Sequence, residues 1–319
     1  AFTNKFPPTN DYSIGYKVKV PSYYKDVDNW LNSQGNNFRY IGFPLREEGI
    51  TYKWEKGYAG VELQVALFST SGIIHKTSVP FFNQIVPEIE KNLLSDNDFS
   101  TFANLINARY YIVRYDIDYK LREMTDPVII EQALIKREKS GEVKRIGEFG
   151  RVSIWENLKW QDNIFYAANN IKRVESFDNA DITNIDTLSG DIFLEEEIPI
   201  DIQKTDQSIT PKISYEKINP TRYIAHLINI NPPFLLFFSE LYNKGWKASY
   251  ESGEVIDNHF RANIYGNGWL INREGDFDIV IEFTPQHWMD LGEKVSLGSY
   301  VLMLGFVLYL LISNRRSKV

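Results

Sequence analysis

The last twenty-five residues constrain this chain most, because residues 295–313, VSLGSYVLMLGFVLYLLIS, contain no charged side chain. Nineteen helical residues span about 28 Å, which is close to the hydrocarbon thickness of a bilayer. Only serine and glycine interrupt the apolar run, whereas a helix buried in a soluble core normally carries a polar stripe. The sequence therefore predicts a membrane-spanning helix, with a buried core helix as the alternative.

Basic residues follow this run at Arg315, Arg316 and Lys318. Because basic residues near a span favour the cytoplasmic side, residues 314–319 are predicted to be a cytoplasmic tail. Residues 1–294 are then extracytoplasmic on a cell membrane. Trp288 lies just before the span, at a depth where tryptophan is favoured, so Trp288, Arg315 and Arg316 are the predicted membrane anchors.

The other end opens AFTNKFPPTN, without a methionine, a basic region or an apolar region of the kind that export signals carry. We therefore expect residues 1–16 to follow a missing N-terminal transmembrane part of the same multi-pass protein.

Composition excludes several kinds of site. The 319 residues are 43% hydrophobic and 14% aromatic, which is enough for two domains. The absence of cysteine excludes disulfides, a thiol nucleophile and a cysteine-ligated metal. The four histidines show no ligand spacing, so no metal site is predicted. A net charge of −7 argues against a nucleic-acid partner.

Helix and strand patterns alternate over residues 17–165, which predicts an α/β domain. A helical pattern starts at Ser22, which is expected to cap it, ends at Gly35 and precedes an apolar run over residues 38–45. The same order recurs at residues 99–116. A third helical pattern over residues 127–140 precedes a hairpin around Gly147 and Gly150.

Residues 166–290 predict an antiparallel β-sandwich of jelly-roll type, which makes the chain an α+β multidomain protein. The predicted strands are residues 222–230, 234–240, 246–250, 262–265, 269–272 and 277–283, and turns are expected at 243–245, 252–253, 266–268 and 274–276. The acidic residues 178–206 are expected to form edge strands and loops, with the acidic run 195–197 as a solvated surface.

Aromatic and hydrogen-bonding side chains gather in this β region, the mixture expected of a sugar site. The carbohydrate-binding candidates are Glu240, Tyr242, Trp246, Arg261, Asn263, Asn267 and Trp269. Each has a structural alternative: a strand tryptophan usually packs in a core, Asn267 between two glycines suits a left-handed turn, and Glu240 could pair with Arg261.

Three segments resemble the extracytoplasmic C-terminal region of polytopic GT-C membrane glycosyltransferases, the arabinofuranosyltransferase-like and related polymer-glycosylating proteins. They are ISYEKINPTRYIAHLINI, PFLLFFSELYNKGWKASY and HFRANIYGNGWLINREGDFDIVIEFTPQ, followed at once by the terminal span. The segments PSYYKDVDNWLNSQGNNFRYIGFPL, YKWEKGYAG and NARYYIVRYD are similar to the block after the last group of spans in such proteins.

The resemblance implies a reaction that this chain does not complete alone. In this group a carboxylate in an early outside loop deprotonates the acceptor or coordinates a divalent metal, while a polyprenyl phosphate leaves the donor sugar. No position here matches that loop, so no catalytic residue and no cofactor is assigned to this chain. The implied role is binding of an acceptor glycan or lipid-linked sugar, or shaping of the site above the membrane.

A second class of function remains open, a non-catalytic, membrane-anchored carbohydrate-binding or scaffold protein. An independent glycosidase is disfavoured, because Asp276, Asp278 and Glu282 alternate as the ordinary polar face of a strand.

Overall fold

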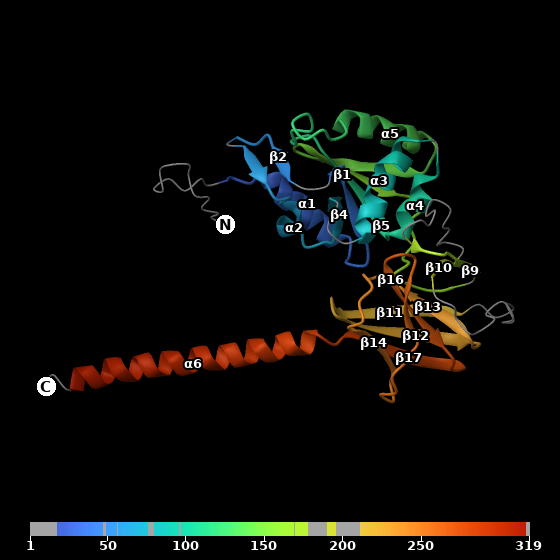
Figure 1. The fold of residues 1–319 in the computed structure, drawn as a ribbon. Coiled ribbons are helices and arrows are strands. Elements are labelled where there is room, and N and C mark those ends of the chain that lie inside the picture. Colours follow the sequence, from blue (N-terminus) through green and yellow to red (C-terminus); the bar gives the residue numbers. More distant parts are fainter. Residues whose placement is uncertain are drawn as a thin grey trace. The chain divides into compact units, whose positions relative to one another are not determined.

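The computed structural model describes residues 18–46, 49–55, 57–75, 80–95, 97–168, 170–177, 190–195 and 211–316. They form two compact units that alternate along the chain (Figure 1). The first unit contains the residues up to 204 together with 235–241 and 260–268, and the second contains 205–234, 242–259 and 269 onwards. The predicted N-terminal segment 1–16, most of the acidic stretch 178–206, and Lys318 in the predicted tail lie outside the described residues.

A five-stranded sheet in the order β4-β1-β5-β7-β6 forms the centre of the first unit. Its strands are β1 (Arg39–Arg46), β4 (Gly72–His75), β5 (Ala108–Arg114), β6 (Val143–Phe149) and β7 (Val152–Asn157). Strands β4 and β5 run parallel to β1, whereas β7 is antiparallel to β5 and to β6. The helices are α1 (Ser22–Ser33), α2 (Gln64–Leu67), α3 (Pro80–Leu94), α4 (Phe99–Leu105) and α5 (Pro127–Lys139). The predicted helix–strand alternation is confirmed.

The two faces of this sheet are covered by different helices (Figure 1). Helix α1 buries Tyr24, Val27 and Leu31 in the same apolar cluster as Tyr110 and Ile112 of β5. On the opposite face, Phe99 of α4 packs against Phe43 and Tyr111, with ring centroids 6.4 and 5.1 Å apart. Because successive strand residues point to opposite faces, the continuous apolar run in β5 supplies both layers.

The ends of the helices follow their local sequence, with one correction. Ser22 is the first helical residue of α1, and the cap position is Pro21, which makes no side-chain cap hydrogen bond. The predicted serine cap is therefore wrong, because the fixed extended backbone of Pro21 already turns the chain into the helix. Helix α5 does have a side-chain cap, since Asp126 accepts a hydrogen bond from the Val128 amide.

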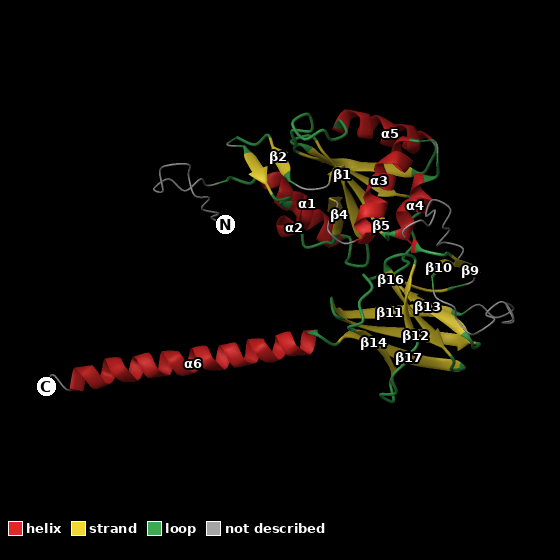
Figure 2. Cartoon of the chain, in the orientation of Figure 1, coloured by secondary structure: helices red, strands yellow, loops and turns green. Residues whose placement is uncertain are grey.

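The rest of the described chain is largely β-structure, as Figure 2 shows. An antiparallel sheet has the order β11-β12-β17-β14 and a second has the order β15-β16-β13-β8, while β9 pairs with β10 and β2 with β3. The bounds are β2 (Ile50–Tyr52), β3 (Tyr58–Gly60), β8 (Phe165–Ala167), β9 (Asn170–Arg173), β10 (Asp191–Leu194), β11 (Lys212–Asn219), β12 (Arg222–Ile230), β13 (Phe234–Phe238), β14 (Trp246–Tyr250), β15 (His259–Ala262), β16 (Gly266–Ile271) and β17 (Gly275–Phe283).

The assignments on either side of residue 265 differ from the prediction, and β17 begins at Gly275, inside the turn expected at 274–276. Residues 263–265 form a turn, with left-handed backbone at Asn263 and Ile264 (φ 47° and 71°), where a strand was expected. Residues 266–268 belong to β16, where a turn was expected. The two glycines there serve close packing: a Cβ on Gly266 would lie 2.4 Å from the Phe237 ring, and one on Gly268 would lie 2.2 Å from the Phe260 ring.

The border between the units also differs from the predicted border after residue 165. Strand β8 pairs with β13 through Phe165, Tyr166 and Ala167, and these residues and their partners in β13 belong to the first unit. Pairing between distant segments therefore keeps residues beyond 165 with the first unit. The change from helical to β-type sequence does not mark this border.

Helix α6 (Gln286–Arg316) begins after two residues that follow β17. Its segment Gln286–Leu310 is long and apolar enough to cross a membrane, and none of its most apolar window is buried. Residues 286–294, which precede the predicted span, are already helical. The amide and hydroxyl of Thr284 both donate to the Gly245 carbonyl, at 2.9 and 3.0 Å, which ties the helix start to the loop before β14.

The Gly72→Ala substitution is expected to destabilise the first unit. A Cβ at Gly72 would lie 2.2 Å from Cζ of the buried Tyr40, so the ring or the edge strand must move. Overpacking of this kind costs about 1–3 kcal/mol. Thermal unfolding followed by circular dichroism should show a lower midpoint. Gly147→Ala is the matched control, because its Cβ meets no atom within 4 Å; equal midpoints for the two variants would contradict the packing argument.

Candidate carbohydrate-binding site

Four of the seven predicted sugar-binding residues are buried: Trp246, Asn263, Asn267 and Trp269. Trp246 packs between Tyr223 and Phe283, with ring centroids 6.2 and 5.3 Å away. Trp246 is therefore a core residue, the alternative given above, because a ring enclosed in this way offers no open face to a sugar.

The two asparagines hold the backbone of the first unit. Asn263 accepts a hydrogen bond from the Phe193 amide at 2.7 Å and donates to the Tyr166 hydroxyl at 2.5 Å. Asn267 donates to the Glu240 carbonyl at 2.7 Å. The left-handed turn expected at Asn267 is wrong, because Asn267 lies in strand β16 and has no positive φ, whereas the nearby Asn263 does. Both side chains are occupied within the fold.

Glu240 and Arg261 each form an ion pair with a different residue and not with each other. Glu240 accepts from Arg39 at 3.1 Å. Arg261 donates to Glu195 at 2.7 Å and lies over the Phe177 ring at 4.7 Å. Partial burial would raise the pKa of Glu195, but hydrogen bonds from the Phe177 amide and Arg261 outweigh it and hold that pKa below its usual range. The Glu240–Arg261 pair that the sequence suggested is not formed.

Tyr242 and Trp269 do come together in the second unit, through a residue outside the seven. The half-buried His259 stacks on Trp269, with ring centroids 4.6 Å apart and planes inclined by 8°. Tyr242, also half-buried, lies beside His259, with ring centroids 5.1 Å apart and planes inclined by 45°. His259 stands in the loop sequence DNHF, and only its aromatic neighbours in the fold distinguish it from an ordinary surface histidine.

This arrangement can bind the apolar face of a sugar. Two partly exposed rings are supported from below by a buried one, so little side-chain freedom is lost when a ligand arrives. The amide of Leu270 donates to the Asn258 carbonyl at 3.2 Å, which fixes the backbone beside His259. Asp257 and Asn258 are exposed next to the rings and supply polar groups for hydroxyls. We call Tyr242, His259 and Trp269 the ring stack.

Buried acids in the first unit have a structural role. Asp116 accepts from the Tyr23 hydroxyl at 2.7 Å, the Tyr24 hydroxyl at 3.2 Å and the Trp54 indole at 2.6 Å. Burial, reinforced by contact with Asp116, raises the pKa of Tyr23 far above its usual value, so this hydroxyl stays a donor. No spacing in the sequence predicts this cluster, because Trp54 and Asp116 are far from Tyr23 and Tyr24 along the chain.

The same end of β5 carries a buried ion pair. Arg114 pairs with Glu62, which also accepts from the Tyr52 hydroxyl. The remaining donors of Arg114 reach backbone carbonyls of β1. Among the residues that the structure describes, no group of three or more histidine and acidic residues could hold a metal ion. These acids are engaged within the fold.

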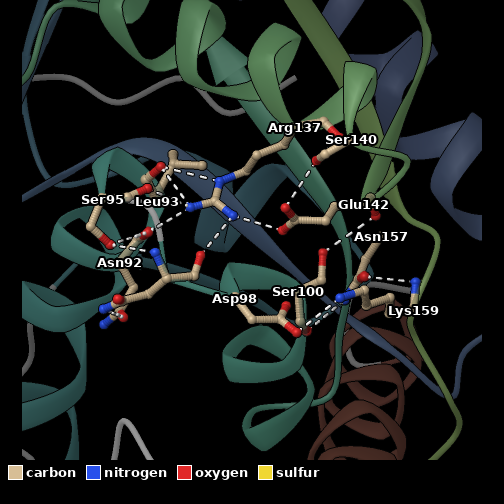
Figure 3. A network of polar contacts seen from close by, with 11 residues as sticks. Asn92, Leu93, Ser95, Asp98, Ser100, Arg137, Ser140, Glu142, Asn157 and Lys159 are labelled. Atoms are coloured by element: carbon tan, nitrogen blue, oxygen red, sulfur yellow. Dashed lines mark hydrogen bonds and ion pairs between the residues drawn. The ribbon is translucent and has the colours of Figure 1, made fainter.

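A cavity of about 430 Å³ opens between α3 and α5, beside the buried Arg137. Figure 3 shows the Arg137 guanidinium pointing to Asn92, Leu93 and Ser95, with Glu142 on its other side. It donates to the carbonyls of these three residues and of Asn97, which closes the C-terminal end of α3. Its donors are therefore used within the fold and are not open to a ligand in the cavity.

Replacing Arg137 by methionine should destabilise the first unit by about 3–5 kcal/mol, because the partly buried Glu142 carboxylate and several carbonyls lose their Arg137 donor. Chemical denaturation should report the loss. The neighbouring exposed Lys136→Met is the control and should change little. Equal stability of both variants would show that Arg137 does not secure the end of α3.

Glu90 of α3 ties β1 to the segment before α5. Its two oxygens accept from the Leu45 amide at 2.7 Å and the Thr125 hydroxyl at 2.6 Å. Burial raises the pKa of Glu90 above its usual value, and these two hydrogen bonds offset part of the increase.

This raised pKa predicts a pH dependence of stability. Between the unfolded and the higher folded pKa of Glu90 the folded chain binds more protons, so stability falls as pH rises through that window. Glu90→Gln should remove this part of the decline in unfolding free energy, measured from pH 4 upward. Glu88→Gln on the same helix is the control, and a wild-type decline in both variants would refute the assignment.

Comparison with known proteins finds little. No protein-family model and no curated protein matches the chain. The cryo-EM structure of the arabinofuranosyltransferase AftD from mycobacteria is 11% identical, with a TM-score of 0.42, covering 83% of this chain and 30% of that chain. A mutant form of the same enzyme gives 12% identity, a TM-score of 0.42, and coverage of 83% and 31%. The chain thus spans less than a third of that enzyme, and the likeness is a weak one of architecture alone.

Proposed function

We propose that this chain is the extracytoplasmic C-terminal part of a membrane glycosyltransferase that uses a lipid-linked sugar donor. Its role is to hold the acceptor glycan above the membrane. The observation that carries the proposal is the ring stack, two partly exposed rings on a buried tryptophan, in the same unit as the apolar helix α6.

The connection to α6 suits this role. Two residues separate β17 from α6, and Thr284 is bonded to Gly245, so the sheet follows the helix closely. A glycan on the ring stack would therefore stay near the membrane surface, where a polyprenyl-linked donor presents its sugar. Sugar-ring contacts with aromatic faces and hydrogen bonds to adjacent polar groups supply the affinity.

The chemistry itself is assigned to the missing part of the protein. Within the described residues, the buried acids Glu62 and Asp116 are held by several donors each and bind other parts of the fold. A catalytic carboxylate, the polyprenyl-phosphate sugar and any divalent metal would then belong to the membrane part. That part would also place residues up to 294 outside the cell and the C-terminus inside.

The second candidate is a non-catalytic, membrane-anchored carbohydrate-binding or scaffold protein. The same ring stack and helix favour it, and the two candidates differ only in what precedes this chain. Ten or so spans with an acidic first outside loop in the full reading frame favour the transferase. A short upstream region with no sugar transfer favours the binding protein.

In the transferase, Tyr242→Ala and His259→Ala should raise the KM for an oligosaccharide acceptor about tenfold and leave kcat nearly unchanged, because they remove binding shared by ground and transition states. The assay follows transfer from polyprenyl-phosphate sugar in membranes that contain the full-length protein. Lys247→Ala, an exposed strand residue of the same unit, is the control. A fall in kcat with unchanged KM would overturn the acceptor-holding role.

A further inference from the structure

Trp160 is a half-exposed ring that the first unit holds rigidly. Its indole nitrogen donates to Asn107 Oδ1 at 2.8 Å, and its amide donates to the Asn157 carbonyl at 3.2 Å. The guanidinium of Arg109 lies 4.9 Å from the ring centroid. A surface tryptophan fixed by its nitrogen, its backbone and one neighbour has little conformational freedom left to lose on binding.

Arg109 and Glu156 form an ion pair beside this ring, and the pair keeps hydrogen-bonding capacity for a ligand. Nε and Nη2 of Arg109 both donate to Oε1 of Glu156, at 3.1 and 3.0 Å. Both Arg109 bonds go to Oε1, and none of the hydrogen bonds of the described residues uses Nη1. The Tyr110 hydroxyl is also hydrogen-bonded to the Glu156 carboxylate, whose two oxygens can accept further bonds. The side chains are 25% and 23% exposed. A donor and an acceptor therefore stand next to each other at the surface.

Aromatic rings continue around the pair. The Arg109 guanidinium also lies 5.0 Å from the Tyr110 ring and 5.7 Å from the Phe38 ring. Tyr110 packs edge-on against the half-exposed Trp30, with centroids 5.0 Å apart. These neighbours fix the guanidinium plane, so the direction of its open donors is set before any ligand binds.

We propose that Trp160, Arg109 and Glu156 form a second sugar-binding site in the first unit, for a neutral sugar with two adjacent hydroxyls. One hydroxyl accepts from Nη1 of Arg109, its neighbour donates to Oε2 of Glu156, and the C–H face of the ring lies against Trp160. The ion pair is neutral overall, which favours an uncharged sugar over a phosphate or a uronic acid. This site is separate from the ring stack and stands without the proposed transferase activity.

The test uses the whole chain in nanodiscs and four neutral probes, maltotetraose, mannotetraose, xylotetraose and arabinotetraose. Titration calorimetry with probe concentrations up to about 10 mM detects a Kd of about 1 mM.

At least one probe should bind. Trp160→Ala should weaken its binding about tenfold, and Trp160→Phe should retain most of the affinity. Arg109→Lys should also weaken binding, because lysine lacks the planar fork. Lys139→Ala, at an exposed position of α5 in the same unit, is the control.

The outcomes separate this site from the ring stack. Binding that falls in Trp160→Ala and Arg109→Lys but persists in Tyr242→Ala supports the second site, whatever becomes of the proposed function. Binding that depends on Tyr242 alone overturns the second site and leaves the ring stack. Absence of binding by all four probes overturns the second site as well. So does a loss of affinity in Trp160→Ala when Arg109→Lys and Trp160→Phe both bind like the wild type.

Discussion

The first unit depends on one buried guanidinium. Arg114, the last residue of β5, donates to the carbonyls of Gly42, Phe43 and Pro44 and pairs with Glu62 beyond the β2–β3 hairpin. A charge withdrawn from water is costly unless every donor is used, so these contacts must form together or not at all. One side chain thereby fixes β1, β5 and the hairpin segment relative to one another. Asp116, two residues later, anchors α1 and Trp54 in the same way.

Local patterns sufficed where local physics decides the structure. Residues 222–230 and 246–250 were predicted exactly as β12 and β14, because their alternating burial follows from their own sequence. Helix α1 was likewise predicted from the helical pattern that starts at Ser22 and ends at Gly35. The terminal apolar helix needed only length and composition.

Prediction failed where a residue's role is set by distant neighbours. Glycines at 266 and 268 read as a turn, yet each is required by an aromatic ring from another strand. Glu240 was expected beside Arg261, but its partner is Arg39, about two hundred residues earlier in the chain. The candidate site shows the same division. Tyr242 and Trp269 were predicted as candidates from their residue type. The contacts of His259 with both rings, and the Arg109–Glu156 pair beside Trp160, depend on tertiary contacts that no sequence spacing predicts.

The junction between β17 and α6 has a mechanical consequence. A flexible linker would let the helix and the sheet move independently, but the hydrogen bonds from Thr284 to Gly245 couple rotation of the helix to the sheet. His287, in the first turn of α6, adds a contact to Glu282 at 2.7 Å, so the junction resists torsion from two sides. In a bilayer, a change of thickness that tilts α6 would therefore also tilt the sheet β11-β12-β17-β14 relative to the membrane plane.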